Sequence, residues 1–100
     1  MATYSWVEEK RQSNLKKHGV DVLDAARVFE SLHIEMQAKM VEGERRWRAI
    51  GPLRPPDTRP AGWSGPLVTV VYTMVQGRTR ISSARRARDD ERQHYHRHIE

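Results

Sequence analysis

The sequence predicts a single α+β domain, in which two N-terminal helices pack on an antiparallel sheet of three or four strands and a C-terminal helix completes the fold. Two observations predict this architecture. Apolar residues before residue 32 recur at the helical period, whereas residues 67–75 are almost continuously apolar and β-branched, as in a central strand. The length of 100 residues, 37% of them hydrophobic, allows one compact core and argues against disorder throughout the chain.

Two helices are predicted in the first third of the chain. Strong helix formers fill residues 7–18, and Gly19 follows them, where a glycine ends a helix in the left-handed conformation at little cost. A second helix is predicted over residues 22–31, with Asp21 as its N-cap. Its apolar positions recur at the helical spacing, and they are Val22, Ala25, Ala26 and Phe29.

Four strands are predicted after these helices, over residues 33–39, 44–50, 67–75 and 78–83. The first of them would equally suit a helix. The second alternates arginine with Trp47 and an alanine, which is the period of a strand with two different faces. The dipeptide Gln76-Gly77 indicates a hairpin turn between the last two strands.

A long loop is predicted over residues 51–66, because this segment holds all five prolines and three of the six glycines. Trp63 inside it is either an anchor for a partner or a lid over its own hairpin, and the sequence leaves both interpretations open. Helical composition returns near the C-terminus and predicts a last helix over residues 85–97.

Several classes of protein are excluded by composition. The longest apolar run is far shorter than the roughly 20 residues that span a bilayer, so no contact with a membrane is expected. The chain has no cysteine, no signal peptide and no glycine-rich phosphate loop. We therefore expect a cytoplasmic protein without disulfides, thiol chemistry or bound nucleotide cofactor.

The positive charge of the chain, +5, is carried mainly by arginine, which supplies 14 of the 18 cations. A guanidinium group offers a planar fork of donors that suits phosphate oxygens. Pairing of the strand that bears Arg46 and Arg48 with the strand that bears Arg78 and Arg80 would gather four such groups into an anion-binding patch. The alternatives are that Glu35, Glu44 or a helix carboxylate neutralises the patch, or that the arginines are only solvated charge.

A second anion site is predicted where the last strand would run into the last helix, because helix N-termini present free amide groups to phosphate. The residues at this junction are Ser82, Ser83, Arg85 and Arg86. The histidines near the C-terminus, which are His94, His96 and His98, resemble an accidental tract more than a ligand set. No metal site is therefore predicted.

Three blocks of the sequence, in the right order and over nearly the whole chain, resemble the BrnT family of toxins. The first block contains Trp6, Lys10, Asn14, Lys17-His18-Gly19-Val20, Ala25-Ala26 and Val28-Phe29. The second block is Glu44 to Gly51. The third contains Val70 to Thr73, then Arg80 to Ala87, Glu91 and Tyr95.

This resemblance implies the toxin half of a type II toxin–antitoxin pair, with a RelE-like fold and a ribonuclease activity that inhibits translation. It also implies a partner, a small BrnA-like antitoxin of the ribbon-helix-helix type, which neutralises the toxin and contacts operator DNA. A non-catalytic basic module that binds nucleic acid or protein is the alternative.

By position, the resemblance implies an active site formed by Arg46, Arg80, Ser83 and Arg85, to which we add His18. Further contacts to RNA are expected from Lys17, Arg48, Arg78 and Arg86. Metal-independent cleavage of RNA needs a base, an acid and cations that stabilise the phosphorane. The residues considered for proton transfer are His18, Glu44, Tyr72 and Glu91, although His18 would equally cap a helix, and Glu91 and Tyr95 would equally form a packing pair.

The chain departs from the family pattern at three places. Val7 stands where the family has an aspartate, and this change removes a cap from the first helix. Ser82 stands where the family has an isoleucine, and it places a hydroxyl where an apolar group is expected. The segment 51–66 is longer than its counterpart in the family.

Overall fold

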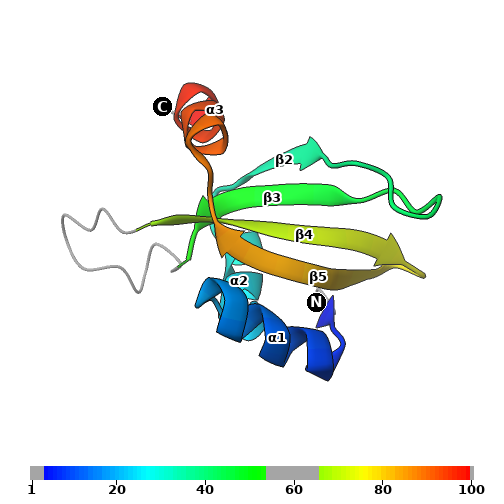
Figure 1. Cartoon of the computed structure of the whole chain (residues 1–100). Coiled ribbons are helices and arrows are strands. Elements are labelled where there is room, and N and C mark those ends of the chain that lie inside the picture. The colour runs from blue at the N-terminus through cyan, green and yellow to red at the C-terminus, as the bar shows by residue number, and fades with distance from the viewer. Residues whose placement is uncertain (1–3, 54–65, 100) are drawn as a thin grey trace.

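A twisted five-stranded sheet organises the computed structural model, which describes residues 4–53 and 66–99 (Figure 1). The strands lie in the order β1-β5-β4-β3-β2, with β1 parallel to β5 and every other pair antiparallel. The elements along the chain are β1 (Tyr4–Ser5), α1 (Glu8–His18), α2 (Val22–Ala25), the 3-10 helix η1 (Ala26–Glu30), β2 (Ile34–Gln37), β3 (Trp47–Pro52), β4 (Leu67–Val75), β5 (Arg78–Arg86) and α3 (Asp89–Ile99). The fold is α+β, as predicted.

The middle of the sheet is β4, whose run of apolar and β-branched residues is buried over most of its length. It forms a hairpin with β5 through Gln76 and Gly77, which have φ angles of 50° and 78°. Positive φ at both central positions is the geometry of a type I′ turn, whose twist matches that of the two strands. Glycine adopts this conformation without strain, and Gln76 is held in it by the hairpin.

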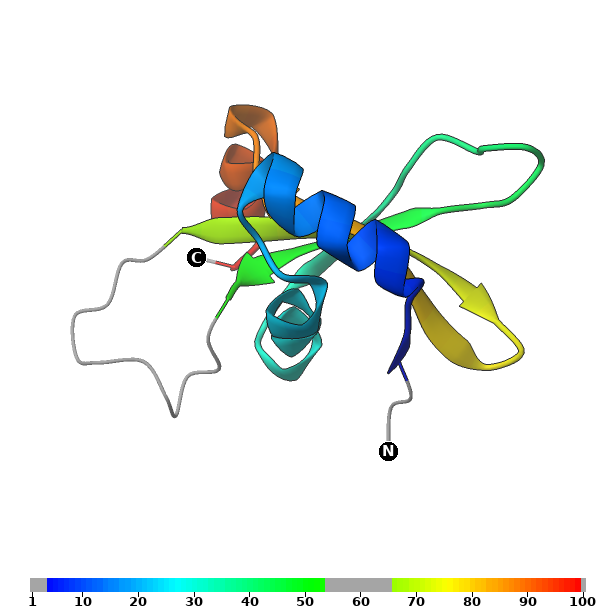
Figure 2. The same ribbon diagram turned by 60° about the horizontal axis from the view of Figure 1, so that its bottom comes forward.

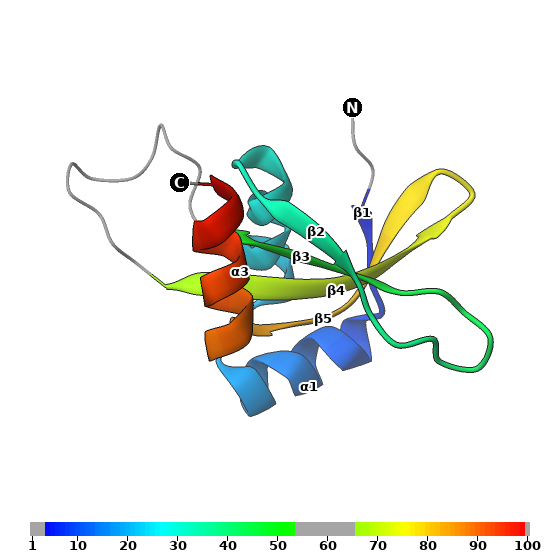
Figure 3. The same cartoon turned by 90° about the horizontal axis from the view of Figure 1, so that it is seen from above.

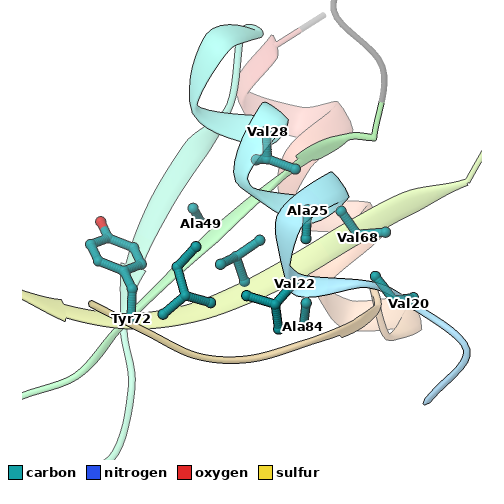
Figure 4. Close-up of a cluster of buried hydrophobic side chains, with 10 residues drawn as sticks. Val20, Val22, Ala25, Val28, Ala49, Val68, Tyr72 and Ala84 are labelled. Carbon is teal, nitrogen blue, oxygen red and sulfur yellow. The ribbon is translucent and has the colours of Figure 1, made fainter. Parts of the chain in front are cut away.

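Helices cover both faces of the sheet (Figures 1 and 3). On one face, α1, α2 and η1 pack over β5, β4 and β3, and α1 runs across the sheet as Figure 2 shows. On the other face, α3 packs against β3 and β2. The larger core lies under α2 and η1, where the side chains of Figure 4 meet: Val20, Val22, Ala25, Val28, Ala49, Val68, Tyr72 and Ala84. A smaller core under α3 contains Ile50, Leu67, Ala87 and Tyr95.

Helix α1 is attached to β5 by one buried side chain, Asn14. Its amide nitrogen donates to the carbonyl oxygens of Ala84 at 2.8 Å and Val20 at 2.9 Å, and its Oδ1 accepts the Ala84 N–H at 3.1 Å. Strand β1 pairs with β5 only at Thr79 and Arg80, so Asn14 replaces a neighbouring strand at Ala84. The rest of α1 follows the expected pattern, since Val7 gives it no side-chain cap and Gly19 ends it at φ 70°.

The sheet differs from the prediction at its edge. It has five strands and is mixed, because the short strand β1 adds to β5 in parallel. Two residues carry no periodic signal, so the sequence alone did not indicate this strand. No helix within residues 4–53 or 66–99 has the length and apolar character of a membrane span.

The predicted end of the last strand at residue 83 is wrong. Strand β5 continues to Arg86, because residues 83–86 pair with Val68 to Val71 of β4 in spite of their helical composition. Helix α3 accordingly begins at Asp89, later than the predicted start at residue 85. Acidic residues in its first turn favour this start, since they complement the positive end of the helix dipole.

Three other boundaries also differ. The second predicted helix is α-helical only to Ala25 and continues as the 3-10 helix η1. Strand β2 is shorter than the predicted segment 33–39, and β3 is shifted to Trp47–Pro52 from the predicted 44–50. The expected loop 51–66 therefore starts inside β3, and Trp63 lies outside the described residues.

Replacement of Asn14 by Ala should destabilise the protein by about 3 kcal/mol, because the N–H and C=O groups of Ala84 would lose their partners at a buried edge. Urea unfolding measures this difference. The matched control is Gln12→Ala on the exposed side of α1, for which we expect a change within about 0.5 kcal/mol. Equal stability of the two variants would show that Asn14 does not hold α1 on β5.

Candidate functional site

A polar pocket of about 200 Å³ lies between α1 and β5, and we call it the α1–β5 pocket. Its lining residues are Lys10, Ser13, Asn14, Lys17, His18, Ser82 and Ser83. Among these described residues none is acidic, and three of them are basic. The pocket therefore offers cationic and hydroxyl groups to an anion, with an imidazole beside them.

Helical spacing accounts for one wall of the α1–β5 pocket. Lys10, Asn14 and Lys17 are four and three residues apart, so they lie along one stripe of α1. Because Asn14 is bonded to Ala84 of β5, this stripe faces the edge of that strand. The two lysines, both exposed, therefore lie on either side of the point at which helix and strand meet.

A β-bulge shapes the other wall. Val71 of β4 pairs with Ser83 of β5, whereas the next residue, Tyr72, pairs with Ile81, so Ser82 is an extra residue in β5. A bulge interrupts the strict alternation of a strand and re-aims its side chains. Both Ser82 and Ser83 line the same pocket as a result. Ser82 is one of the departures from the family pattern, and here it adds a hydroxyl to the pocket.

The face of the sheet under α3 is organised by a buried carboxylate, that of Glu91, which is 1% exposed. It accepts five hydrogen bonds. Arg85 donates through Nη1 at 2.7 Å and Nη2 at 3.0 Å, and Arg48 donates through Nη1 at 2.9 Å. The Thr69 hydroxyl, at 3.0 Å, and the backbone N–H of Arg88, at 2.8 Å, complete the set. We call this group the Glu91 cluster.

The Glu91 cluster keeps its carboxylate ionised. Burial by itself raises the pKa of Glu91, but the hydrogen bonds from Arg85, the Arg88 N–H, Thr69 and Arg48 lower this pKa to about 2. Two arginines share one carboxylate, so the cluster has a net charge of +1. The positive charge of this face is reduced and not removed.

The predicted site residues fall into three groups. Lys17, His18 and Ser83 come together in the α1–β5 pocket. Arg48 and Arg85 belong to the Glu91 cluster, and Arg46 lies 3.6 Å from the carboxylate of Glu44. The exposed arginines of β5 are Arg78, Arg80 and Arg86, and none of them forms an ion pair with another described residue.

The expected patch of four arginines does not form by direct pairing. Strand β3, which contains Arg48 and follows Arg46, is separated from β5 by β4. Two of the four, Arg46 and Arg48, are also paired with carboxylates, as the alternative interpretation anticipated. The sequence predicted all three strands, but not that the central one, β4, separates the two basic strands.

The expected phosphate site at a strand–helix junction is also absent from the described structure. Residues 82–86 belong to β5, and the N-terminus of α3 already has an anion, since Glu91 accepts the Arg88 N–H. This contact is half of a capping box, in which the third helical residue reaches back to the residue before the helix. The spacing that grouped Glu91 with Tyr95 as a packing pair did not reveal this role.

Two residues considered for proton transfer are unsuited to it. Tyr72 is 5% exposed and packs edge-on against Phe29, with ring centroids 5.1 Å apart. Burial, followed by its hydrogen bond to Glu35, raises the pKa of Tyr72, so its hydroxyl stays protonated. Glu91 is fully bonded in its cluster. His18 and Glu44 remain, and only His18 lines the α1–β5 pocket.

Histidines near the C-terminus are arranged along α3. The Nδ1 atom of His98 lies 2.9 Å from the carbonyl oxygen of His94, within one helical turn. Over residues 4–53 and 66–99, no three His, Asp or Glu side chains are grouped as metal ligands.

The comparisons with known proteins agree with this fold. A family model described as the ribonuclease toxin BrnT of type II toxin–antitoxin systems matches residues 6–91. Among solved structures, the Brucella abortus ribonuclease toxin BrnT is similar, with a TM-score of 0.59 and 24% sequence identity. The match covers 89% of this chain and 100% of that chain, and at this identity it supports the fold alone. No curated protein matches the sequence.

The Glu91 cluster should make the protein sensitive to acid. Since the pKa of Glu91 is lowered from its usual 4.5 to about 2, the cluster stabilises the fold fully above pH 4.5. This stabilisation, about 3 kcal/mol, should be lost as the pH falls from 4.5 to 2. Denaturant unfolding across this range measures the loss.

The control is Glu91→Gln, which cannot titrate and should show a shallower loss of stability with acid. If this variant does not fold, Thr69→Val removes one donor and should move the loss to higher pH. An acid profile of Glu91→Gln or Thr69→Val identical to that of the unmodified protein would contradict the role of the cluster.

Proposed function

Because the chain belongs to the BrnT family of ribonuclease toxins of type II toxin–antitoxin systems, we propose that it cleaves RNA in the α1–β5 pocket without a metal ion. One observation carries the proposal. The pocket brings His18 together with two lysines and two serines, and no carboxylate is among its described lining residues. This set suits a phosphodiester, because its charge is opposite to that of the phosphate and its imidazole can transfer a proton.

In this proposal Lys10 and Lys17 bind the scissile phosphate from the α1 side. Negative charge on the phosphoryl oxygens increases as the phosphorus becomes five-coordinate, so ammonium groups fixed beside it stabilise the transition state more than the substrate. The hydroxyl groups of Ser82 and Ser83 donate to the same oxygens from the β5 side. Asn14 is not a catalytic residue, because its amide is bonded to the backbone of Ala84 and Val20.

His18 is the proton-transfer group in this mechanism. Its neutral imidazole accepts the proton of the ribose 2′-hydroxyl, and the 2′-oxygen forms a bond to the adjacent phosphorus. The bond from phosphorus to the 5′-oxygen breaks, water protonates that oxygen, and the His18 imidazolium returns its proton to the hydroxide that is left. The products are a 2′,3′-cyclic phosphate and a 5′-hydroxyl, and no metal ion or oxidant takes part.

The exposed arginines of β5 extend the binding surface beyond the pocket. We propose that Arg80, with Arg78 and Arg86, binds phosphates of the RNA strand as it passes along β5. Arg46 adds to the attraction of RNA. For Arg48 and Arg85 we propose a positioning role in place of the RNA contacts expected, because their guanidinium groups donate to Glu91 at the start of α3.

The family also supports a partner. We propose that a small antitoxin of the ribbon-helix-helix type neutralises this toxin and that operator DNA is contacted through the antitoxin. We propose that this protein acts in the cytoplasm, because messenger RNA and ribosomes are found there.

Substitution of His18 tests the proposed chemistry. Purified protein is incubated in EDTA with a long single-stranded RNA and, separately, with a translating extract, and the cleaved ends are analysed. His18→Ala should cleave at least about 100-fold more slowly, because general acid–base catalysis contributes factors of this size. The matched control is His98→Ala on exposed α3, which should keep the full rate.

Intact RNA in both settings with the unmodified protein would overturn the proposed function and favour a binding module. Cleavage that disappears in EDTA and returns with added magnesium would overturn metal independence. Equal rates for the His18 and His98 variants would place the chemistry elsewhere on the molecule.

Replacement of Arg80 by Ala separates RNA binding from folding. We expect RNA to bind more weakly and cleavage at low RNA concentration to slow, while the free energy of unfolding stays within about 1 kcal/mol, since Arg80 is exposed. Arg85→Ala should instead lower stability by about 2–4 kcal/mol, because it leaves the buried carboxylate of Glu91 without two of its donors. Cleavage rate and urea unfolding of both variants are the measurements, and Arg27→Ala on η1 is the control. Unfolding of the Arg80 variant would mean that this arginine is structural.

A further inference from the structure

A second hollow of about 420 Å³ lies on the sheet face that η1 covers, and we call it the aromatic groove. Its lining residues are Phe29, Glu35, Trp47, Tyr72, Met74 and Thr79. None of them lines the α1–β5 pocket. The groove is therefore separate from the site to which we assign RNA cleavage.

The walls of the aromatic groove are held by contacts between rings. Tyr4 stacks on Phe29 with ring centroids 5.5 Å apart, and Phe29 meets Tyr72 edge-on at 5.1 Å. His33 contacts the same phenylalanine edge-on at 5.5 Å. Trp47 pairs with Tyr72 across β3 and β4, so the two side chains lie on the same face of the sheet. A cavity with such fixed walls can bind a ligand without first being ordered.

The charge of the groove is opposite to that of the protein. The chain carries +5, yet the one charged residue among those that line the groove is Glu35. The Tyr72 hydroxyl donates to this carboxylate and His33 lies 3.5 Å away, but the side chain is 54% exposed, so it keeps lone pairs that a ligand can reach. An acidic group among aromatic rings attracts cations and repels phosphates. This argues against an RNA strand in the groove and favours a cationic side chain.

We propose that the aromatic groove binds an arginine side chain of the antitoxin. The planar guanidinium group suits both features of the groove, because it stacks on an aromatic ring such as Trp47 and donates paired hydrogen bonds to a carboxylate such as Glu35. Met74, which is 53% exposed, supplies apolar contact for the aliphatic part of that side chain. The identity of the partner rests on the proposed function, whereas binding of a guanidinium group does not.

The first test uses a probe that contains only the proposed ligand chemistry. The peptide acetyl-Gly-Arg-Gly-amide is titrated into the ¹⁵N-labelled protein, and the indole N–H resonance of Trp47 is followed after its assignment with Trp47→Phe. We expect a saturable shift with a dissociation constant in the millimolar range. The same peptide with citrulline in place of arginine should bind at least tenfold more weakly, because citrulline has the same shape without the charge.

Variants at two carboxylates provide the matched comparison. Glu35→Gln should weaken binding of the arginine peptide at least tenfold, whereas Glu44→Gln, outside the groove, should leave it unchanged. No shift of the Trp47 resonance in the unmodified protein would overturn the proposal. Tighter binding of guanosine monophosphate than of the peptide at the same resonance would also overturn it, in favour of a base-binding site.

The second test uses the antitoxin itself, taken as the small protein encoded beside this chain. Glu35→Gln should bind it at least tenfold more weakly while cleaving RNA at the unmodified rate. Unchanged affinity would overturn the assignment to the antitoxin, as would self-association of the unmodified protein that Glu35→Gln abolishes, since the arginine would then come from a second copy. If the unmodified protein binds the arginine peptide but does not cleave RNA, the proposed function is refuted and the proposal for the groove stands.

Discussion

The carboxylate of Glu91 joins three strands and a helix at one point. Arg48 reaches it from β3, Thr69 from β4 and Arg85 from β5, while the Arg88 N–H closes the first turn of α3 on it. A buried charge with so many donors fixes the position of α3 along the sheet, because any shift would leave part of the carboxylate unbonded. This constraint also determines which arginines are left to bind RNA, since Arg48 and Arg85 are both paired with Glu91.

On the other face of the sheet, Asn14 fixes α1 against β5. A helix cannot satisfy the backbone groups at the edge of a strand with its own backbone, so α1 docks on β5 through one side chain that both donates and accepts. Docking at Ala84, next to the bulge at Ser82, places the lysines of α1 opposite the serines of β5. The α1–β5 pocket is thus a consequence of how the edge of the sheet is closed.

The sequence predicted the periodic elements and missed those that depend on tertiary contacts. The α1 and β4 segments carry strong local patterns, and the α+β class followed from them. Residues 83–86 have helical composition but pair with β4, and β1 is too short to show a period. The pairing of Arg85 with Glu91, six residues apart across a strand end and a helix start, required knowledge of where the strand ends. The spacing of Lys10, Asn14 and Lys17 could have indicated one stripe of α1, but Lys10 was not among the predicted site residues.

The surface of this protein has basic regions and one acidic groove, a separation that the net charge of +5 does not reveal. The basic groups to which we assign RNA binding or positioning lie at the α1–β5 pocket, on exposed β5 and at the Glu91 cluster, whose two arginines and one carboxylate leave +1. On the sheet face that η1 covers, Glu35 is the one charged residue lining the aromatic groove. A polyanion approaching from solution is therefore drawn to the basic groups and repelled from the groove. The arginine that we propose for the partner would therefore meet no competition from RNA in the groove.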